Sequence, residues 1–388
     1  MITISLATFL ILGVMLAGCI GGNTNTTETS TTMVKLVNCK GQGTMPQLLS
    51  TGELDGVIAW QPMPAVLETK DIGKVVIYSG DLPPKGMWKN HPCCVMVVSD
   101  EARKNKNYAV NEFVKLIVLS AREMEKNKTL AIEASAQWLG VDRKVEEKSI
   151  PTIKFITDPK LIVNGTLNFV EVMRDQGALS GRLNTTDKNK IINTLFDFET
   201  YEKVVKEIED NTPVAPPYPP SEAPTLRVAH LPSDHHAALS VAATYPELFK
   251  KKYNLYLKEV EPKKKYILYR GDKKVADVEL ILVQEGGAKI MTLMAQKQID
   301  IGLNGVPPAV FAIDKGTQGK IVCALNSEGS AVVVRKDIPA NNWDEFVNWI
   351  KEQHKNGKVV KIGYPLPVSI QYVMLKSALD AEGITYSE

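Results

Sequence analysis

The 388-residue chain lacks several features that would mark a common function. Its net charge is only +2, so no basic footprint for nucleic acid is present and no nucleic-acid partner is expected. It contains no P-loop, no nucleophile elbow and no paired-carboxylate motif, which favours a protein that is not an enzyme. The spacing of its five cysteines fits no disulfide framework, and no CxxC or HExxH pair marks a metal site.

Long apolar runs are also missing beyond the N-terminus, and the one that exists is short for a bilayer span. Ile2 to Ala17 is apolar and ends in Leu16-Ala17-Gly18-Cys19, the pattern of a lipobox. Asn23 to Thr32 then forms a polar, low-complexity stretch that reads as a disordered tether. We expect cleavage before Cys19, lipidation of Cys19, and a protein anchored by lipid to the extracytoplasmic face of the cell membrane. An uncleaved anchor would also leave the rest of the chain outside.

The most informative feature that is present is an internal repeat. Leu48–Val76 and Leu293–Val322 both read as helix, polar turn, apolar strand, proline-marked loop and helix, and Asp55 matches Asp300. Two similar βα units predict two similar α/β lobes with a ligand-binding cleft between them. Chance similarity between two βα units remains the alternative.

The repeat also predicts an unusual order of segments. The first copy is preceded by the strand Val34–Asn38 but lacks the strand and helix expected before it. These stand at the other end of the chain, at Lys361–Ala378. We therefore expect a circularly permuted order in which Lys361–Tyr364 and Val34–Val37 pair in one sheet. The proline-rich stretch Val214–Pro224 would join the former chain ends as a semi-rigid linker.

Read in rotated order, the segments resemble the nitrate/sulfonate/taurine family of solute-binding proteins of ABC importers. The motifs that carry the resemblance are RVAHLPSDHHAAL, GGAKIMTLMAQKQIDIGLNGVPPAVFAIDKG, LNSEGSAVVV, KIGYPLPVSIQ, MPQLLSTGELDGVIAWQPMPA and NHPCCVMVV. The resemblance implies a two-lobed α/β fold of the type II periplasmic-binding-protein class, here permuted. Two crossover strands, within Asn90–Val98 and Ser330–Val334, would join the lobes.

Helices are expected at 110–126, 129–139, 161–176 and 187–208. The resemblance also divides the chain into seven parts. The predicted parts are the signal peptide with its lipobox (1–19), the tether (20–32), the second half of lobe 2 (33–88), a crossover strand with helices of lobe 1 (89–212), the linker (213–224), the α/β core of lobe 1 (225–335) and the first half of lobe 2 (336–388).

The resemblance places the ligand contacts on loops at the carboxyl ends of strands. The candidate ligand-binding residues are Asp234, His235, His236, Asn304, Val306, Ser327, Glu328, Ser330, Ser369, Gln371, Trp60, Gln61, Asn90 and His91. Helix starts among these loops favour an anionic group on the ligand. Asp234 and Ser369 are equally explained as helix caps, and Trp60 as a core residue. Adjacent His235 and His236 leave room for only one of them to face the cleft.

The predicted function is capture of a small polar or anionic ligand, such as nitrate, a sulfonate, taurine or bicarbonate, and delivery to a membrane permease with its ATPase. No cofactor, metal or catalytic residue is expected. The alternative is a metal-binding protein or metal-dependent enzyme, related to a pyrimidine-synthase branch of the family. The candidate residues for such a metal or catalytic site are Asp234, His235, His236, His91, Cys93 and Cys94. If His91 and His236 met Cys93 across the cleft, they could bind zinc, copper or iron. A ligand sensor is a third reading.

Overall fold

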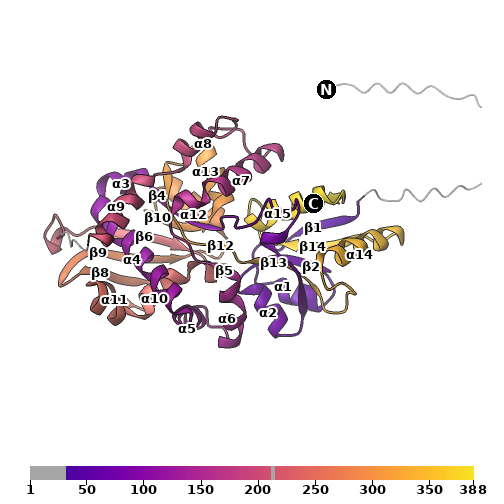
Figure 1. Cartoon of the computed structure of the whole chain (residues 1–388), viewed down its shortest axis with the longest axis horizontal. Helices are drawn as coiled ribbons and strands as arrows, with labels where there is room; N and C mark the ends of the chain where they lie inside the picture. The colour runs from indigo at the N-terminus through magenta and orange to yellow at the C-terminus, as the bar shows by residue number, and fades with distance from the viewer. Residues whose placement is uncertain (1–31, 211–214) are drawn as a thin grey trace, which may run out of the picture. The chain divides into compact units, whose positions relative to one another are not determined.

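The computed structural model describes residues 32–210 and 215–388, which form an α/β structure (Figure 1). The lipobox, Cys19 and all but the last residue of the tether lie outside the described residues, as does the start of the predicted linker. None of the helices in the two described ranges is both long and apolar enough to cross a bilayer.

The first sheet has six strands and unites the two ends of the described chain (Figure 1). Its order is β15 (Tyr386–Ser387), β1 (Val34–Asn38), β14 (Val360–Tyr364), β2 (Gly56–Trp60), β13 (Ser330–Arg335) and β3 (Gly73–Tyr78). β1 runs parallel to β14, with Lys35 opposite Lys361 and Val37 opposite Gly363. The predicted pairing of Val34–Val37 with the C-terminal strand is therefore confirmed.

The second sheet has seven strands and ends in a β-meander. Its order is β11 (Gly319–Ala324), β4 (Cys94–Ser99), β10 (Ile301–Gly305), β6 (Thr225–His230), β9 (Lys273–Leu282), β8 (Lys265–Arg270) and β7 (Leu255–Glu261). Apolar and polar residues alternate in β7 to β9, as in strands with one buried face, and the turn between β8 and β9 falls at Gly271-Asp272.

The chain passes between the two sheets twice, once from β3 to β4 and once from β11 to β13. Both passages fall where crossover strands were predicted, but β4 begins only at Cys94, four residues later than expected. Asn90 adopts a φ of 55°, which is incompatible with an extended strand at that point. Beside the passages, β5 (Ile153–Lys154) and β12 (Ser327–Glu328) pair as a small separate sheet.

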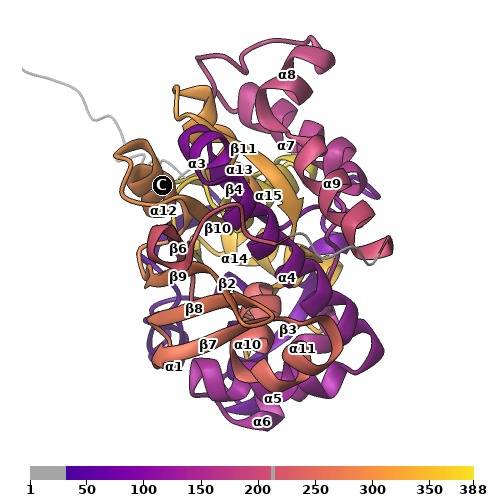
Figure 2. The same cartoon turned by 90° about the vertical axis from the view of Figure 1, so that its left-hand side faces the viewer.

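Helices pack on both sheets. Those that contact the six-stranded sheet are α1 (Met45–Ser50), α2 (Met63–Thr69), α14 (Trp343–Lys355) and α15 (Ile370–Ala381). Those associated with the seven-stranded sheet include α3 (Asp100–Asn105), α4 (Asn107–Lys126), α5 (Lys128–Leu139), α7 (Val163–Asp175), α10 (Ala237–Thr244), α11 (Pro246–Tyr253), α12 (Gly287–Ala295) and α13 (Val306–Asp314). The long helix α4 contacts β7 and β9 (Figure 2). Its buried apolar residues extend the core on this side of the sheet.

One predicted helix assignment needs correction. The stretch expected as one helix over 187–208 is two helices, α8 (Lys188–Leu195) and α9 (Phe198–Glu209). The break occurs because Phe196 bridges to Ile321 of β11, and Asp197 then caps the next helix by accepting a hydrogen bond from the Thr200 N–H. In addition, α6 (Arg143–Ser149), which contacts α2 and α5, was not predicted.

Candidate functional site

A cavity of about 250 Å³ is lined by residues that come from both sheets. The six-stranded sheet contributes Trp60, at the end of β2, and the segment 366–371 that leads into α15. The seven-stranded sheet contributes the start of β4, the loop after β6, and the junction of β10 with α13. Strand ends and helix starts meet here, which is where open α/β sheets bind ligands.

Four of the predicted site residues line this cavity, namely Trp60, His235, Ser369 and Gln371. Ser369 is also the N-cap of α15, since its Oγ accepts a hydrogen bond from the Tyr372 N–H at 3.2 Å. The Nε2 of Gln371 donates to Ser330 Oγ at 2.8 Å. The ring of Trp60 lines the cavity, while its buried Nε1 has no hydrogen-bond partner among the described residues.

A second group of predicted residues is buried but absent from the cavity wall: Asp234, His236, Asn304, Val306 and Ser330. The Val306 N–H donates to the Cys93 carbonyl at 2.9 Å, and His236 Nδ1 accepts from the Leu231 N–H at 3.2 Å. These contacts occupy the Val306 N–H and His236 Nδ1, so neither atom is free to bind a ligand. Asn304 is completely buried, and within residues 32–210 and 215–388 neither of its amide atoms has a hydrogen-bond partner.

The remaining predicted residues lie in or beside the passages between the sheets and do not line the cavity: Gln61, Asn90, His91, Ser327 and Glu328. The Asn90 N–H donates to Glu328 Oε1 at 2.8 Å. Lys154 Nζ donates to both Asn90 Oδ1 and Glu328 Oε1, so β5 is tied to both passages. His91 Nε2 lies 2.9 Å from Ser79 Oγ, and Gln61 Nε2 donates to Thr152.

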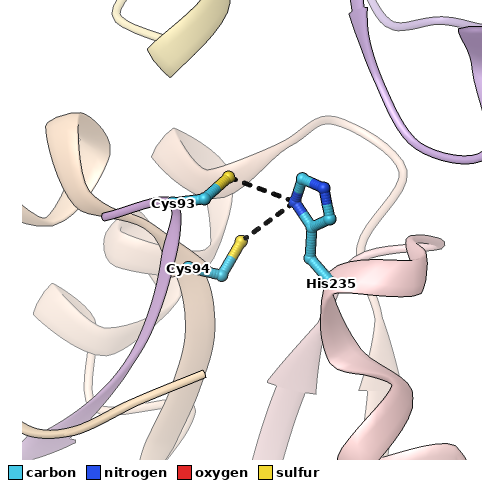
Figure 3. Close-up of side chains that lie close together, drawn as sticks. All are labelled: Cys93, Cys94 and His235. Carbon is cyan, nitrogen blue, oxygen red and sulfur yellow. Dashed lines mark hydrogen bonds between the residues drawn. The ribbon is translucent and has the colours of Figure 1, made fainter. Parts of the chain in front are cut away.

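The cavity wall contains two thiols that the predicted ligand-binding set omitted. Cys93 and Cys94 both point at the ring of His235 (Figure 3), with Sγ to Nδ1 distances of 3.1 Å for Cys93 and 3.7 Å for Cys94. All three side chains are buried, and their ligand atoms lie within 4.8 Å of one another. We call these three residues the thiol–imidazole cluster.

The cluster selects three of the six candidate metal ligands and corrects the predicted meeting of Cys93 with His91 and His236. His91 hydrogen-bonds to Ser79, and His236 Nδ1 is occupied by the Leu231 N–H, so the imidazole that meets the thiols is that of His235. The adjacent Cys93-Cys94 pair was visible in the sequence. Cys93 precedes the first residue of β4, which frees it from the alternation that would direct neighbouring side chains to opposite faces.

Within the cluster, the pKa values of the two thiols shift in opposite directions. The neighbouring Cys93 thiol lowers the pKa of Cys94 well below its usual range, aided by the imidazoles of His235 and His236 and opposed by burial. Burial raises the pKa of Cys93. Burial would lower the pKa of His235, but Cys94 and the Gly329 carbonyl outweigh it and raise that pKa. The cluster therefore favours Cys94 over Cys93 as the thiol that loses its proton first.

Behind the cavity wall lies a pair of carboxyl groups, Asp234 of the loop after β6 and Glu146 of α6, both with no solvent exposure. Ser149 Oγ donates a hydrogen bond to Asp234. Burial, reinforced by the Asp234 carboxyl, raises the pKa of Glu146 to about 10. At neutral pH the pair therefore retains a proton, because two adjacent buried carboxylates repel each other.

The charge of the wall bears on the class of ligand. Among the described residues that line the cavity, Glu285 is the one carboxylate, and no lysine or arginine is present. Leu231, Pro308, Leu366, Val368 and Ile370 give most of the wall an apolar character. An apolar wall with a few directed polar groups is typical of sites for small organic molecules.

Comparison with known proteins agrees with this architecture. The NMT1-like family matches residues 22–140 and 219–388, and the chain belongs to this family of ABC-transporter substrate-binding proteins, which are related to binders of nitrate, sulfonates and thiamine precursors. The chain is 55% identical over 108 residues to the uncharacterized protein MJ1180 of Methanocaldococcus jannaschii, covering 28% of this chain and 74% of that protein. No solved structure matches.

Proposed function

We propose that this protein is the extracytoplasmic solute-binding component of an ABC importer and captures a small ligand in the cavity between its two sheets. The observation that carries the proposal is the cavity itself, because its wall is assembled from both sheets and from both ends of the described chain. Membership of the NMT1-like family supports the same function.

Capture would proceed by closure of two lobes, each built on one of the sheets. The chain joins them only through the passages from β3 to β4 and from β11 to β13. A hinge motion concentrates its backbone changes in such connections. The hydrogen bonds that Asn90, Lys154 and Glu328 make across the passages would set the resting geometry of this hinge.

The partners in this proposal are a membrane permease, which would accept the ligand from this protein, and the cytoplasmic ATPase of that permease. A lipidated Cys19 would tether the protein to the outer face of the cell membrane, with residues 20–32 as the spacer. Cys19→Ser should release the protein from the membrane fraction or block its cleavage, because the rest of the sequence has no apolar run long enough to span a bilayer. Unchanged membrane fractionation with normal cleavage would count against the anchor.

The permuted order is part of the proposal and is supported by the contacts at the chain ends. The Met33 N–H donates to the Thr385 carbonyl at 3.0 Å, and β15 pairs with β1. In rotated order β14, α15, β15 and β1 follow one another as a compact unit of a single sheet.

The charge and polarity of the cavity wall restrict the kind of ligand that can bind. For a small anion such as nitrate, the described cavity wall offers the start of α15 but no basic side chain, and the Glu285 carboxylate would repel the anion. A neutral or cationic molecule with an apolar body and a hydrogen-bonding edge fits the wall better. We therefore propose a neutral or cationic heterocycle ahead of nitrate, sulfonates, taurine or bicarbonate.

A thermal-shift screen tests both the function and the ligand class. Ligands that bind only the native state raise the unfolding midpoint, and about 2.7 kcal/mol of stabilisation is expected at a hundredfold excess over Kd. The screen compares a pyrimidine with nitrate, taurine and bicarbonate. A midpoint raised by the pyrimidine alone supports the proposal; a rise with nitrate alone reverses the ligand class, and no response from a wide solute library counts against solute capture.

A second candidate function is a metal-dependent enzyme related to the pyrimidine-synthase branch of the family. The observation that favours it is the placement of two thiols and an imidazole in the cavity wall. Incubating a bound ligand with the metal-loaded protein and recovering it separates the two functions. A binding protein returns the ligand unchanged, whereas an enzyme returns a product.

A further inference from the structure

We propose that the thiol–imidazole cluster is a three-ligand site for a zinc-type ion, and that the ion forms part of the ligand-binding wall. The inference deepens the proposed function and rests on it only for the ion's role in binding a solute. Site formation itself depends on the geometry of Cys93, Cys94 and His235.

The separations of the donor atoms suit a tetrahedral ion. Bonds of about 2.3 Å to sulfur and about 2.0 Å to nitrogen put a zinc-bound sulfur and nitrogen about 3.5 Å apart. The observed Sγ to Nδ1 distances of 3.1 and 3.7 Å lie on either side of that value. Small rotations of the two thiol side chains would therefore complete the three bonds without a change in the backbone.

The hydrogen bond on the far side of His235 prepares Nδ1 as a ligand. Its Nε2 lies 2.9 Å from the Gly329 carbonyl oxygen, which can only accept, so Nε2 carries the proton. In the neutral ring Nδ1 then presents its lone pair to the two sulfurs. A backbone carbonyl that fixes the tautomer in this way is the usual support of a metal-bound histidine.

The backbone around the cluster is also fixed. The Cys93 N–H donates to the Asn326 carbonyl at 3.0 Å, and the Cys94 N–H donates to Asn326 Oδ1 at 3.1 Å. Gly329 has a φ of +86°, and a Cβ there would come within 2.6 Å of His235 Nε2. The site therefore requires glycine at this position, since any side chain would displace the imidazole.

The donor set identifies the class of ion. Two thiolates and an imidazole are soft to intermediate ligands that select Zn²⁺ or Cu⁺ over Mg²⁺ or Ca²⁺. All three residues line the cavity, so the fourth position of a tetrahedral ion would fall to a group from the cavity. A solute with an aromatic nitrogen donor would bind there, with its apolar body against Trp60 and Leu366.

Cobalt substitution tests the site. The purified chain is stripped with a chelator, reduced, and titrated with Co²⁺, whose tetrahedral thiolate complexes show charge-transfer and visible d–d absorption. We expect one Co²⁺ per chain and displacement by an equivalent of Zn²⁺. Cys93→Ala, Cys94→Ala and His235→Gln should each weaken Co²⁺ binding at least tenfold. Cys39→Ala and Cys323→Ala, which remove buried thiols outside the cavity, should leave the titration unchanged.

The outcomes separate the parts of the inference. Absence of thiolate-to-cobalt absorption in the folded parent chain overturns the site, as does an unchanged titration in Cys94→Ala. Circular dichroism of each variant establishes that it is folded. If His235→Gln unfolds, the parent chain is treated with an alkylating agent with and without Zn²⁺. Protection of Cys93 and Cys94 by Zn²⁺ supports the site, and equal alkylation overturns it.

Imidazole, added to the cobalt form, tests the fourth position. A shift of the visible bands shows that an external nitrogen donor completes the coordination, and an unchanged spectrum shows a closed site and overturns the ligand role. A solute that raises the unfolding midpoint of the metal-free chain keeps the proposed transport function intact even if no Co²⁺ binds.

Discussion

Glu146 and Asp234 illustrate at the scale of single residues how burial alters acid–base behaviour. The pKa of Glu146 is raised to about 10 by burial and by the Asp234 carboxyl, so the folded protein keeps a proton that the unfolded chain releases above about pH 4.5. The unfolded state binds fewer protons in this window, and stability therefore falls as pH rises from about 4.5 to about 10.

We predict that Glu146→Gln, which is neutral and nearly isosteric, is more stable than the parent at pH 8 by roughly 2–4 kcal/mol, with little difference at pH 4. Denaturant unfolding at the two pH values measures this. Glu147→Gln is the matched control, because Glu147 is half exposed on the same helix and pairs with Arg143. Equal responses of the two variants to pH would show that Glu146 is ionised in the folded protein.

Trp60 is the single residue at which we expect the largest effect on ligand binding. Its ring lines the cavity, and its Nε1 has no hydrogen-bond partner within the described parts of the chain. Trp60→Ala should weaken binding of a responding solute by roughly tenfold to a hundredfold. Titration calorimetry measures the affinity, and the unfolding midpoint of the ligand-free variant shows whether Trp60 also stabilises the core. A loss of stability with unchanged affinity would assign Trp60 to packing.

At the scale of elements, the contact between α4 and α11 depends on one buried carboxylate. Burial alone would raise the pKa of Glu123, but hydrogen bonds from Lys126, Lys252 and Tyr253 outweigh it and lower that pKa to about 2. A lowered carboxyl pKa contributes stability above the unfolded value of about 4.5, and that contribution is lost as pH falls from about 4.5 to about 2.

Glu123→Gln should therefore lower the free energy of unfolding by about 1–3 kcal/mol at pH 7, because two cations lose their shared partner. The difference from the parent should shrink below pH 4, which acid and urea titrations would follow. Glu125→Gln on the same helix is exposed and should change little. If both variants behave alike, the network does not join α4 to α11.

Elements also show how far sequence reasoning reaches. The hairpins from β7 to β9 and the pairing of β1 with β14 were predictable, because period-2 patterns and a repeat specify strands and their neighbours. The break between α8 and α9 was not predictable from the sequence. It depends on the bridge from Phe196 to β11, a tertiary contact that leaves Asp197 to cap α9. The meeting of Cys93 with His235 across 142 residues depends on how two passages and a loop pack, which no local pattern encodes.

At the scale of the whole molecule, the position of the chain ends makes the order of segments testable. Met33 and Thr385 are hydrogen-bonded, so residue 388 can be joined to residue 32 through a short glycine–serine linker. New ends at Asp210 and Ala215 then give a chain that runs from 215 to 388 and on through 32 to 210. Every strand pair of both sheets is retained in this order.

We predict that the rearranged chain folds cooperatively with a Tm within about 5 °C of the parent, because moving a connection between nearby ends changes mainly loop-closure entropy. It should also bind one Co²⁺ with the parent spectrum, since the cluster depends on contacts and not on chain order. The control opens the same circle between Val95 and Met96, inside β4, which lies between β10 and β11. That chain should fail to unfold cooperatively. If the chain opened between residues 210 and 215 does not fold, the connection around 211–214 is needed for folding. A linker between residues 388 and 32 then cannot replace that connection.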